Sequence, residues 1–422
     1  MKRVLMIAFH FPPSSMGSGH LRTLGFVRSL PQSGWEPIVL SVNAAALPRV
    51  DTRNLDLIPA HCRVYRSPAL DVRRHLSIRG KYFGFLAQPD GWASWWPMAV
   101  MQGLRLIRKH HVDAIWSTYP IMTAHRIAYT LSRMSGLPWV ADFRDPVAGS
   151  VGKENRYSAT SQHRWEQRVA GAATHTVFTT PGAMASYAAS YPDTAAADRV
   201  SVIPNGYDED LFDDLPEPPA RAPGQPLTLL HSGTLYPDGR NPMCFLTALA
   251  NLKAKGRLAE DDLRVVLRAS GSEAVYGAEL RRLGLERMIT LAPPISSREA
   301  LLEQAGADGL LLFQGHRFDH QIPAKIYEYL RMRRPVLALV GPGGDTDAFL
   351  RSTGCARIVA IDDTAAIEDG LVAFIRDLRD SRAAVAPDSL IRACSRSRGA
   401  ATLAALLDRV SAEPAVRHER SS

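Results

Sequence analysis

The sequence predicts an α/β protein made of two doubly wound domains of similar size. Short strand-like runs alternate with helix-like stretches along the whole chain, which is the pattern of parallel α/β layers. The 422 residues are too many for one compact core and fit two domains. A polar, proline-rich stretch at residues 208–226 lies at mid-chain and is typical of a domain linker.

The first domain is predicted over residues 1–207. It begins with a short apolar run after Lys2 and Arg3, which mimics a signal peptide. Because Pro12 and Pro13 break that run, we interpret it as a first buried strand. The remaining apolar runs predict strands at 37–42, 113–117, 138–141, 175–179 and 200–203, and the stretches between them predict helices at 20–30, 98–109, 123–135 and 162–170.

The second domain is predicted over residues 227–394. Its expected strands are 227–231, 264–269, 289–292, 309–313, 336–340 and 357–361, and its expected helices are 241–255, 273–283, 298–304 and 323–333. A last amphipathic helix is expected at about 399–411.

The bulk composition narrows the class of protein. Apolar residues make up 46% and charged residues 22%, as in a globular chain. The formal charge of +8 is compatible with nucleic acid, an anionic membrane surface or phosphorylated substrates as partners. Nucleic acid ranks last, because the sequence has no zinc-finger spacing, no RNP-like motif and no unbroken basic run. The four cysteines are scattered, and no apolar run reaches the roughly 18 residues of a membrane span, so we expect a cytoplasmic protein, soluble or peripheral to the membrane.

The most informative stretch is residues 321–340, which predict a short helix that leads into a buried strand. Pro323 suits the first position of the helix, and Lys325 and Glu328 lie three residues apart on one face. Residues 336–340 are uniformly apolar, as a parallel strand covered on both sides should be. A helix N-terminus, a lysine and a carboxylate therefore meet at a sheet edge. Such a combination can hold a phosphorylated, hydroxyl-rich ligand such as a nucleotide sugar.

Two loops of the first domain also follow strands. Gly17 and Gly19 would let backbone amides approach an anion where a helix begins, although Arg22 departs from the dinucleotide fingerprint. An ordinary turn between a strand and a helix is the alternative there. Asp142, Arg144 and Asp145 follow the fourth strand, at the end where doubly wound sheets bind ligands. A local arginine–aspartate pair in a capped loop is the alternative at this position.

Together these motifs resemble glycosyltransferase family 4. Residues 323–330 read P-x-K-x-x-E-Y-L, P-V-L-A follows at 335–338, and 202–208 read V-I-P-N-G-x-D, so the resemblance extends over most of the chain. The resemblance implies the GT-B fold, with two Rossmann-like domains facing each other across a cleft and the tail at about 395–422 packing back on the first domain. Two positions depart from the family: Thr234 stands where an arginine is usual, and His320 replaces the first glutamate of the E-x7-E pair.

The resemblance also implies site residues. Donor binding would involve Gly17, Gly19, Gly233, Arg240, Gly271, Ala324, Lys325 and Glu328, and the catalytic or acceptor-facing candidates are Asp142, Arg144, Asp145 and His320. Arg240 and Lys325 would grip the diphosphate and Glu328 the ribose. No metal and no cofactor is expected, because basic groups can offset the charge of the leaving diphosphate.

The implied activity is transfer of a sugar from a nucleotide sugar to a glycan or lipid-linked acceptor, in surface-polysaccharide or glycolipid assembly. A sugar-nucleotide epimerase of the same fold stays open, as does a non-catalytic scaffold subunit, which His320 and Thr234 would suit.

Residues 63–96 mix basic and aromatic side chains and can touch an anionic membrane surface. The residues concerned are Arg73, Arg74, Arg79, Lys81, Tyr82, Phe83, Phe85, Trp92, Trp95 and Trp96. A partly buried acceptor-side excursion with an ordinary charged face is the alternative. A membrane contact here would make the protein peripheral on the inner face of the cell membrane.

Overall fold

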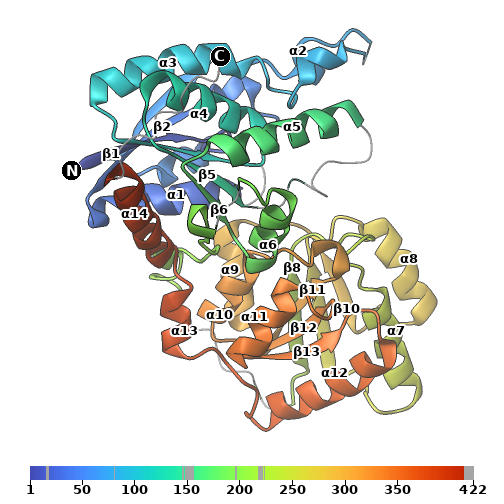
Figure 1. The fold of residues 1–422 in the computed structure, drawn as a ribbon. Coiled ribbons are helices and arrows are strands. Elements are labelled where there is room, and N and C mark those ends of the chain that lie inside the picture. The colour runs from blue at the N-terminus through green and yellow to red at the C-terminus, as the bar shows by residue number, and fades with distance from the viewer. Residues whose placement is uncertain are drawn as a thin grey trace. The chain divides into compact units, whose positions relative to one another are not determined.

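The computed structural model describes residues 1–15, 19–79, 81–144, 147, 156–194, 197–216, 222 and 224–412. The chain divides into two compact units (Figure 1). Met1–Asn205 and the residues from Arg396 onward form the N-terminal unit, and Gly206–Ser395 form the C-terminal unit. Each unit is an α/β layer structure around its own sheet, as the sequence predicts.

The described part of the N-terminal unit contains one parallel sheet in the order β3-β2-β1-β4-β5-β6-β7. The strands are β1 (Lys2–Ile7), β2 (Trp35–Val42), β3 (Arg63–Ser67), β4 (Ala114–Thr118), β5 (Trp139–Arg144), β6 (His175–Phe178) and β7 (Val200–Val202). The chain reverses its direction of winding between β1 and β4. Doubly wound sheets bind their ligands outside the carboxyl ends of the strands at such a point.

Helices cover both faces of this sheet. They are α1 (Gly19–Ser29), α2 (Val72–His75), α3 (Trp95–His110), α4 (Met122–Ser135), α5 (Arg156–Ala172), α6 (Pro181–Ser190) and α14 (Arg396–Ala412). Alternate residues of β1 enter different cores: Leu5 and Ile7 pack with α3 and α4, while Val4 and Met6 pack with α1 and α14. Burial on both faces explains why this strand is apolar at every position from Val4 onward.

The C-terminal helix α14 packs against α1. Gly25 of α1 lies so close to Arg396 that a Cβ atom there would be 2.5 Å from the arginine Cδ. The residues after position 395 therefore belong to the N-terminal unit.

The described part of the C-terminal unit contains a parallel sheet in the order β10-β9-β8-β11-β12-β13, which reverses between β8 and β11. Its strands are β8 (Leu227–Ser232), β9 (Leu263–Arg268), β10 (Ile289–Ala292), β11 (Gly309–Gln314), β12 (Val336–Val340) and β13 (Ala356–Ala360). Its helices are α7 (Met243–Ala254), α8 (Glu273–Leu283), α9 (Ser297–Gly306), α10 (Lys325–Arg331), α11 (Asp345–Thr353), α12 (Thr364–Arg379) and α13 (Asp388–Ala393).

Several elements differ from the sequence-based expectations. Strand β3 and helices α2, α6, α11, α12 and α13 were not predicted, and α10 begins at Lys325, so Pro323 precedes the helix and does not start it. The amide of Ile326 donates to the carbonyl of Pro323, which makes a tight turn before α10. Trp95, expected on a surface, is fully buried in the core of the N-terminal unit.

Candidate active site

The reversal point of the C-terminal sheet carries Lys325 against the turn that follows β8. The ammonium group of Lys325 donates a hydrogen bond of 2.8 Å to the carbonyl oxygen of Ser232. Gly233 has a φ of 129°, and a Cβ atom at this position would lie 2.6 Å from the Lys325 Nζ. The backbone conformation favours glycine here, and any side chain would displace the ammonium group of Lys325.

Arg240 is a second cation close to Lys325. Its Nε donates to the Gln314 side chain at 2.9 Å, which ties it to the end of β11. Its guanidinium group lies 4.7 Å from the ring centre of Phe318 and 5.5 Å from that of Tyr236. Aromatic faces hold a guanidinium in place without neutralising it. Arg240 is therefore fixed in a position where its charge acts on the same site.

The pKa of Lys325 reflects its burial and the neighbouring charges. Burial, followed by the charge of Arg240, lowers the pKa of Lys325 to about 7, and Glu328 acts in the opposite direction. Two cations at one sheet edge repel each other and favour a bound anion, because an anion would stabilise the charged form of the lysine. A diphosphate has the charge and the size to do so.

The turn after β9 joins the same edge. Ala269 has a φ of 56° and Gly271 a φ of 80°, and a Cβ on Gly271 would lie 3.0 Å from the Cγ2 of Thr234. The amide of Leu235 donates to the carbonyl of Ser270 at 3.0 Å. Uncommon backbone conformations of this kind cluster at ligand sites. The ends of β8, β9 and β11 thus form one continuous polar edge.

Two buried groups support the turn after β8. His231 is fully buried, its Nδ1 lies 2.9 Å from the carbonyl oxygen of Leu311, and burial holds its pKa well below the usual range. The Tyr329 hydroxyl accepts a hydrogen bond of 3.3 Å from the amide of Ser232. A neutral histidine and a tyrosine therefore hold the backbone to which Lys325 is bonded.

The other predicted donor residues surround α10. Ala324 is the N-cap residue of α10, and Glu328 is half-buried in its first turn. His320 is exposed, between the 3-10 turn His316–Phe318 and α10. The structure thus brings Gly233, Arg240 and Lys325 together, whereas the expected contact of His320 with a sugar stays a prediction.

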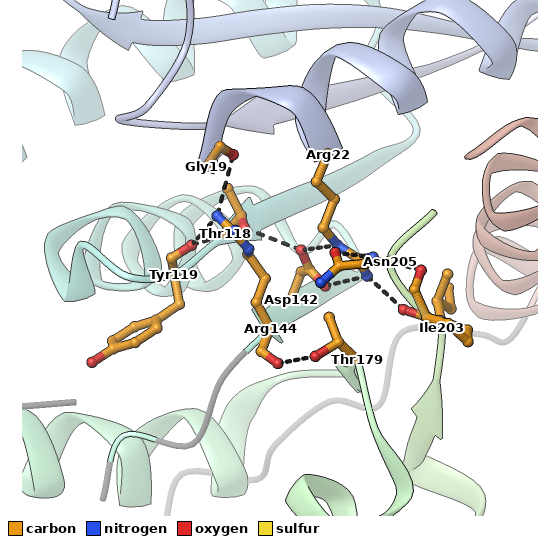
Figure 2. A network of polar contacts seen from close by, with 10 residues as sticks. Gly19, Arg22, Thr118, Tyr119, Asp142, Arg144, Thr179, Ile203 and Asn205 are labelled. Carbon is orange, nitrogen blue, oxygen red and sulfur yellow. Dashed lines mark hydrogen bonds and ion pairs between the residues drawn. The ribbon is translucent and has the colours of Figure 1, made fainter. Parts of the chain in front are cut away.

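A second polar network lies at the reversal point of the N-terminal sheet (Figure 2). Arg22 forms a two-pronged ion pair with Asp142, with Nε to Oδ2 at 3.0 Å and Nη2 to Oδ1 at 2.9 Å. The Thr118 hydroxyl donates to the same carboxylate at 3.0 Å. Arg22 also donates to the carbonyls of Ile203 and Pro204, at 2.9 and 3.0 Å. Asp142 is fully buried, and its carboxylate accepts hydrogen bonds from Arg22 and Thr118. The carboxylate therefore holds α1 against β5.

Arg144 ends β5 in a left-handed conformation, with a φ of 62°. Its Nη1 donates to the carbonyl of Gly19 at 3.2 Å, and its own carbonyl accepts from the Thr179 hydroxyl (Figure 2). Arg144 is only half-buried and joins the first turn of α1 to the ends of β5 and β6. Of the two described catalytic candidates at this edge, Asp142 is fully buried and Arg144 is not. Gly17 and Asp145, also predicted, lie outside the described residues.

Two residues of this edge were not identified from the sequence as site residues. Arg22 was noted only as a departure from the dinucleotide fingerprint, and His10 was not singled out. His10 is largely buried, its Nδ1 has no hydrogen-bond partner among the described residues, and burial together with Arg144 and His20 lowers its pKa to about 4. The sequence signal for His10 was its place in the loop after β1, three residues beyond the end of the strand.

The described residues contain no group of three or more His, Cys, Asp or Glu side chains able to hold a metal ion. In the same described part of the chain, no helix is both long and apolar enough to cross a membrane.

Comparisons with solved structures agree with this arrangement. The α,α-trehalose 6-phosphate synthase of Burkholderia multivorans superposes with a TM-score of 0.64 at 13% identity, covering 98% of this chain and 99% of that one. The sucrose-phosphate synthase of Thermosynechococcus elongatus gives a TM-score of 0.63 at 13% identity, covering 98% and 97%. Anabaena HepE in complex with UDP-glucose gives 0.56 at 15% identity, covering 98% of each chain.

The two doubly wound units and these neighbours define the fold class as GT-B, which confirms the predicted class. In sequence, no curated protein matches. Residues 18–206 match the model of the glycosyl transferase 4-like domain, and this match to the N-terminal part of the chain supports the glycosyltransferase that the motifs predict.

Proposed function

We propose that this glycosyltransferase transfers a sugar from a nucleoside-diphosphate sugar to an acceptor hydroxyl, with the donor bound at the reversal point of the C-terminal sheet. The observation that carries this proposal is Lys325, a lysine with a pKa of about 7 bonded to the backbone of β8 and lying close to a second cation, Arg240. The complex of HepE with UDP-glucose supports a uridine diphosphate sugar as the first donor to test.

In the proposed reaction the bond between the anomeric carbon and the diphosphate oxygen breaks, and the diphosphate keeps the electron pair. The acceptor oxygen forms the new bond to carbon and releases its proton. Lys325 and Arg240 would offset the charge that develops on the leaving diphosphate, which basic side chains can do without a metal ion. The missing side chains of Gly233 and Gly271 would let the phosphates approach the backbone.

For the remaining predicted residues we propose roles in binding the donor or the acceptor. Glu328 would accept hydrogen bonds from the ribose hydroxyls, and His320 would hydrogen-bond the transferred sugar. In the N-terminal unit, Arg144 and the first turn of α1 at Gly19 would bind the acceptor, and Asp142 would position them through Arg22. The acceptor would be a glycan or a lipid-linked sugar of a surface polysaccharide or glycolipid, used at the inner face of the cell membrane.

The first test is a thermal-shift panel of UDP, GDP, ADP, dTDP and CMP with the wild type, Lys325→Ala and Glu328→Ala. A ligand that binds only the native state raises the melting temperature. We expect one nucleotide to stabilise the wild type and to lose this effect in Lys325→Ala. Arg264→Ala is the matched control, because Arg264 is an exposed cation at the start of β9, at the opposite end of the strand from the site.

Assays on the same protein preparation distinguish a transferase from an epimerase and from a non-catalytic scaffold. A transferase consumes the nucleotide sugar only when an acceptor is added, apart from slow hydrolysis. Conversion of the sugar without any acceptor would identify an epimerase. Absence of any nucleotide shift at millimolar ligand would contradict the donor site and favour a non-catalytic scaffold.

A further inference from the structure

Only one of the two units of this protein carries a net positive charge. The N-terminal unit has 28 Lys and Arg against 15 Asp and Glu, a net charge of +13, whereas the C-terminal unit has 22 against 27, a net charge of −5. The donor site therefore lies in the acidic unit. Binding of a nucleotide by the acidic unit does not explain why the chain as a whole carries a net positive charge.

One segment of the N-terminal unit combines this charge with exposed apolar side chains. Residues 72–89 contain four Lys and Arg and no Asp or Glu. In the same segment Ile78 is 80% exposed, Phe83 73% and Phe85 69%, and the two phenylalanine rings lie 5.9 Å apart. We call these three residues the aromatic tip. Figure 1 shows α2 and the chain around it projecting from the body of the unit, away from its sheet.

A basic cavity adjoins the aromatic tip. Its volume is about 300 Å³, and it is lined by Phe85, Gln88, Arg126, Ser161, Arg164, Trp165 and Arg168. We call it the arginine pocket. Phe85 belongs to both features, so the pocket opens beside an exposed aromatic side chain. Helices α4 and α5 supply the three arginines.

Two of the three arginines of the pocket, Arg126 and Arg168, lie against aromatic rings. The Arg126 guanidinium lies 4.2 Å from the ring centre of Trp96 and 5.6 Å from that of Trp165, and Arg168 lies 4.8 Å from Trp165. Among the described residues, none of the three guanidinium groups of the pocket forms an ion pair or a hydrogen bond. Three such groups around one cavity leave their donors available for a phosphate, which arginine binds well.

We propose that this face of the N-terminal unit docks on an anionic bilayer, with the arginine pocket binding the phosphate of a lipid headgroup and the aromatic tip inserting beside it. Aromatic side chains at the interface and basic side chains near anionic headgroups are the two contributions that hold a peripheral protein on a bilayer. A free phosphate would not require the exposed phenylalanines. The inference rests on the proposed function, because it places the protein where a lipid-linked acceptor is available.

The test is co-sedimentation of the full chain with vesicles of phosphatidylcholine alone and of phosphatidylcholine with phosphatidylglycerol. We expect binding only to the anionic vesicles. Each basic side chain near an anionic surface contributes about 1 kcal/mol, so Arg164→Ala with Arg168→Ala should weaken binding roughly thirtyfold. Phe83→Ser with Phe85→Ser should weaken it at least about tenfold through the loss of inserted apolar area.

Matched controls lie on α4 outside the pocket: Arg133→Ala and Met134→Ser remove an exposed cation and an exposed apolar side chain of the same unit and should bind as the wild type. Equal binding to both kinds of vesicle, or wild-type binding by the pocket variants, would overturn the proposal. Release by millimolar inorganic phosphate together with normal binding of the phenylalanine variants would identify a phosphate site and overturn the bilayer. UDP binding is measured separately on every variant. It tests the donor site independently of binding to the vesicles.

Discussion

At the scale of single residues, Gly233 determines whether Lys325 can reach the backbone of β8. Any side chain at position 233 meets the lysine Nζ at 2.6 Å in a backbone conformation that suits glycine alone. We expect Gly233→Ala to displace Lys325, to abolish nucleotide binding in titration calorimetry and to cost roughly 1–3 kcal/mol of stability through backbone strain.

Gly256→Ala separates these two effects. Gly256 also has a positive φ, of 63°, but nothing lies within 4 Å of the added Cβ. This control should show the strain without the loss of nucleotide. Normal nucleotide affinity in Gly233→Ala would mean that Lys325 does not need its place beside Ser232.

The pKa of Lys325 predicts a pH dependence of nucleotide binding. The free protein holds this pKa at about 7, and a bound diphosphate would raise it, so binding above pH 7 takes up a proton. Affinity should therefore fall as the pH rises above 7, by at most about tenfold per pH unit. Calorimetry in buffers of different ionisation enthalpy measures the proton uptake directly. The ligand itself contributes little in this range, because the second phosphate pKa is about 6.

The stability of the free protein should change with pH in the opposite direction to nucleotide affinity. The folded pKa of about 7 lies below the unfolded value of 10.5, so the unfolded chain binds more protons between these two values. Stability of the free protein should rise with pH across this window. Lys325→Met should flatten both profiles, and an unchanged slope of affinity in this variant would assign the proton to another group.

At the scale of elements, the buried pair of Arg22 and Asp142 ties α1 to β5. The two side chains are 5% and 0% exposed. Removing one partner of such a pair leaves an uncompensated buried charge, so we expect Arg22→Ala to lose about 3–5 kcal/mol. All seven tryptophans lie in the N-terminal unit, so tryptophan fluorescence during urea unfolding reports on that unit alone.

The control for this prediction is Lys2→Ala, which breaks an ion pair with Asp408 whose side chains are about half exposed. An exposed pair contributes roughly 0–1 kcal/mol. An equal shift of the fluorescence transition in both variants would indicate that burial of the Arg22 pair adds no stability.

The elements also show what the sequence could predict. Strands β10 and β12 have the predicted bounds. In β12 an unbroken apolar run between polar turns marks a buried parallel strand. Strand β3 escaped prediction because it lies at the edge of the sheet and reads R-V-Y-R-S, with basic residues that favour an exposed segment. The start of α10 differs because Ile322 and Pro323 are buried in a turn, which the preference of proline for a first helical turn does not reveal.

The residues of the candidate site also divide into those that a local sequence motif predicts and those that it does not. Lys325 and Gly233 were predicted because each stands in a short local motif next to a strand. The pairing of Arg22 with Asp142 joins residues 120 positions apart, so no local pattern encodes it. His10 was missed for a similar reason, since its low pKa depends on burial and on the charges of Arg144 and His20, which the fold brings to it.

At the scale of the whole molecule, the division of charge between the two units predicts two different responses to salt. The Debye length falls from about 10 Å at 0.1 M salt to about 3 Å at 1 M, which weakens attraction between exposed charges and a bilayer. Adhesion to anionic vesicles, carried by the exposed charges of a unit with a net charge of +13, should therefore fall at least about tenfold over this range.

Nucleotide affinity should fall much less over the same range. The bond between Lys325 and Ser232 lies in a partly buried edge, and burial limits screening by salt. Titration of the nucleotide and co-sedimentation with vesicles in the same salt series compare the two responses in one preparation. A parallel loss of both would mean that one set of exposed charges serves both ligands, and the separation of an acidic donor unit from a basic docking unit would then be wrong. If the protein still binds the nucleotide at a salt concentration that releases it from the vesicles, it can leave the bilayer with its donor bound. Contact with lipid would then limit access to the acceptor and not to the donor.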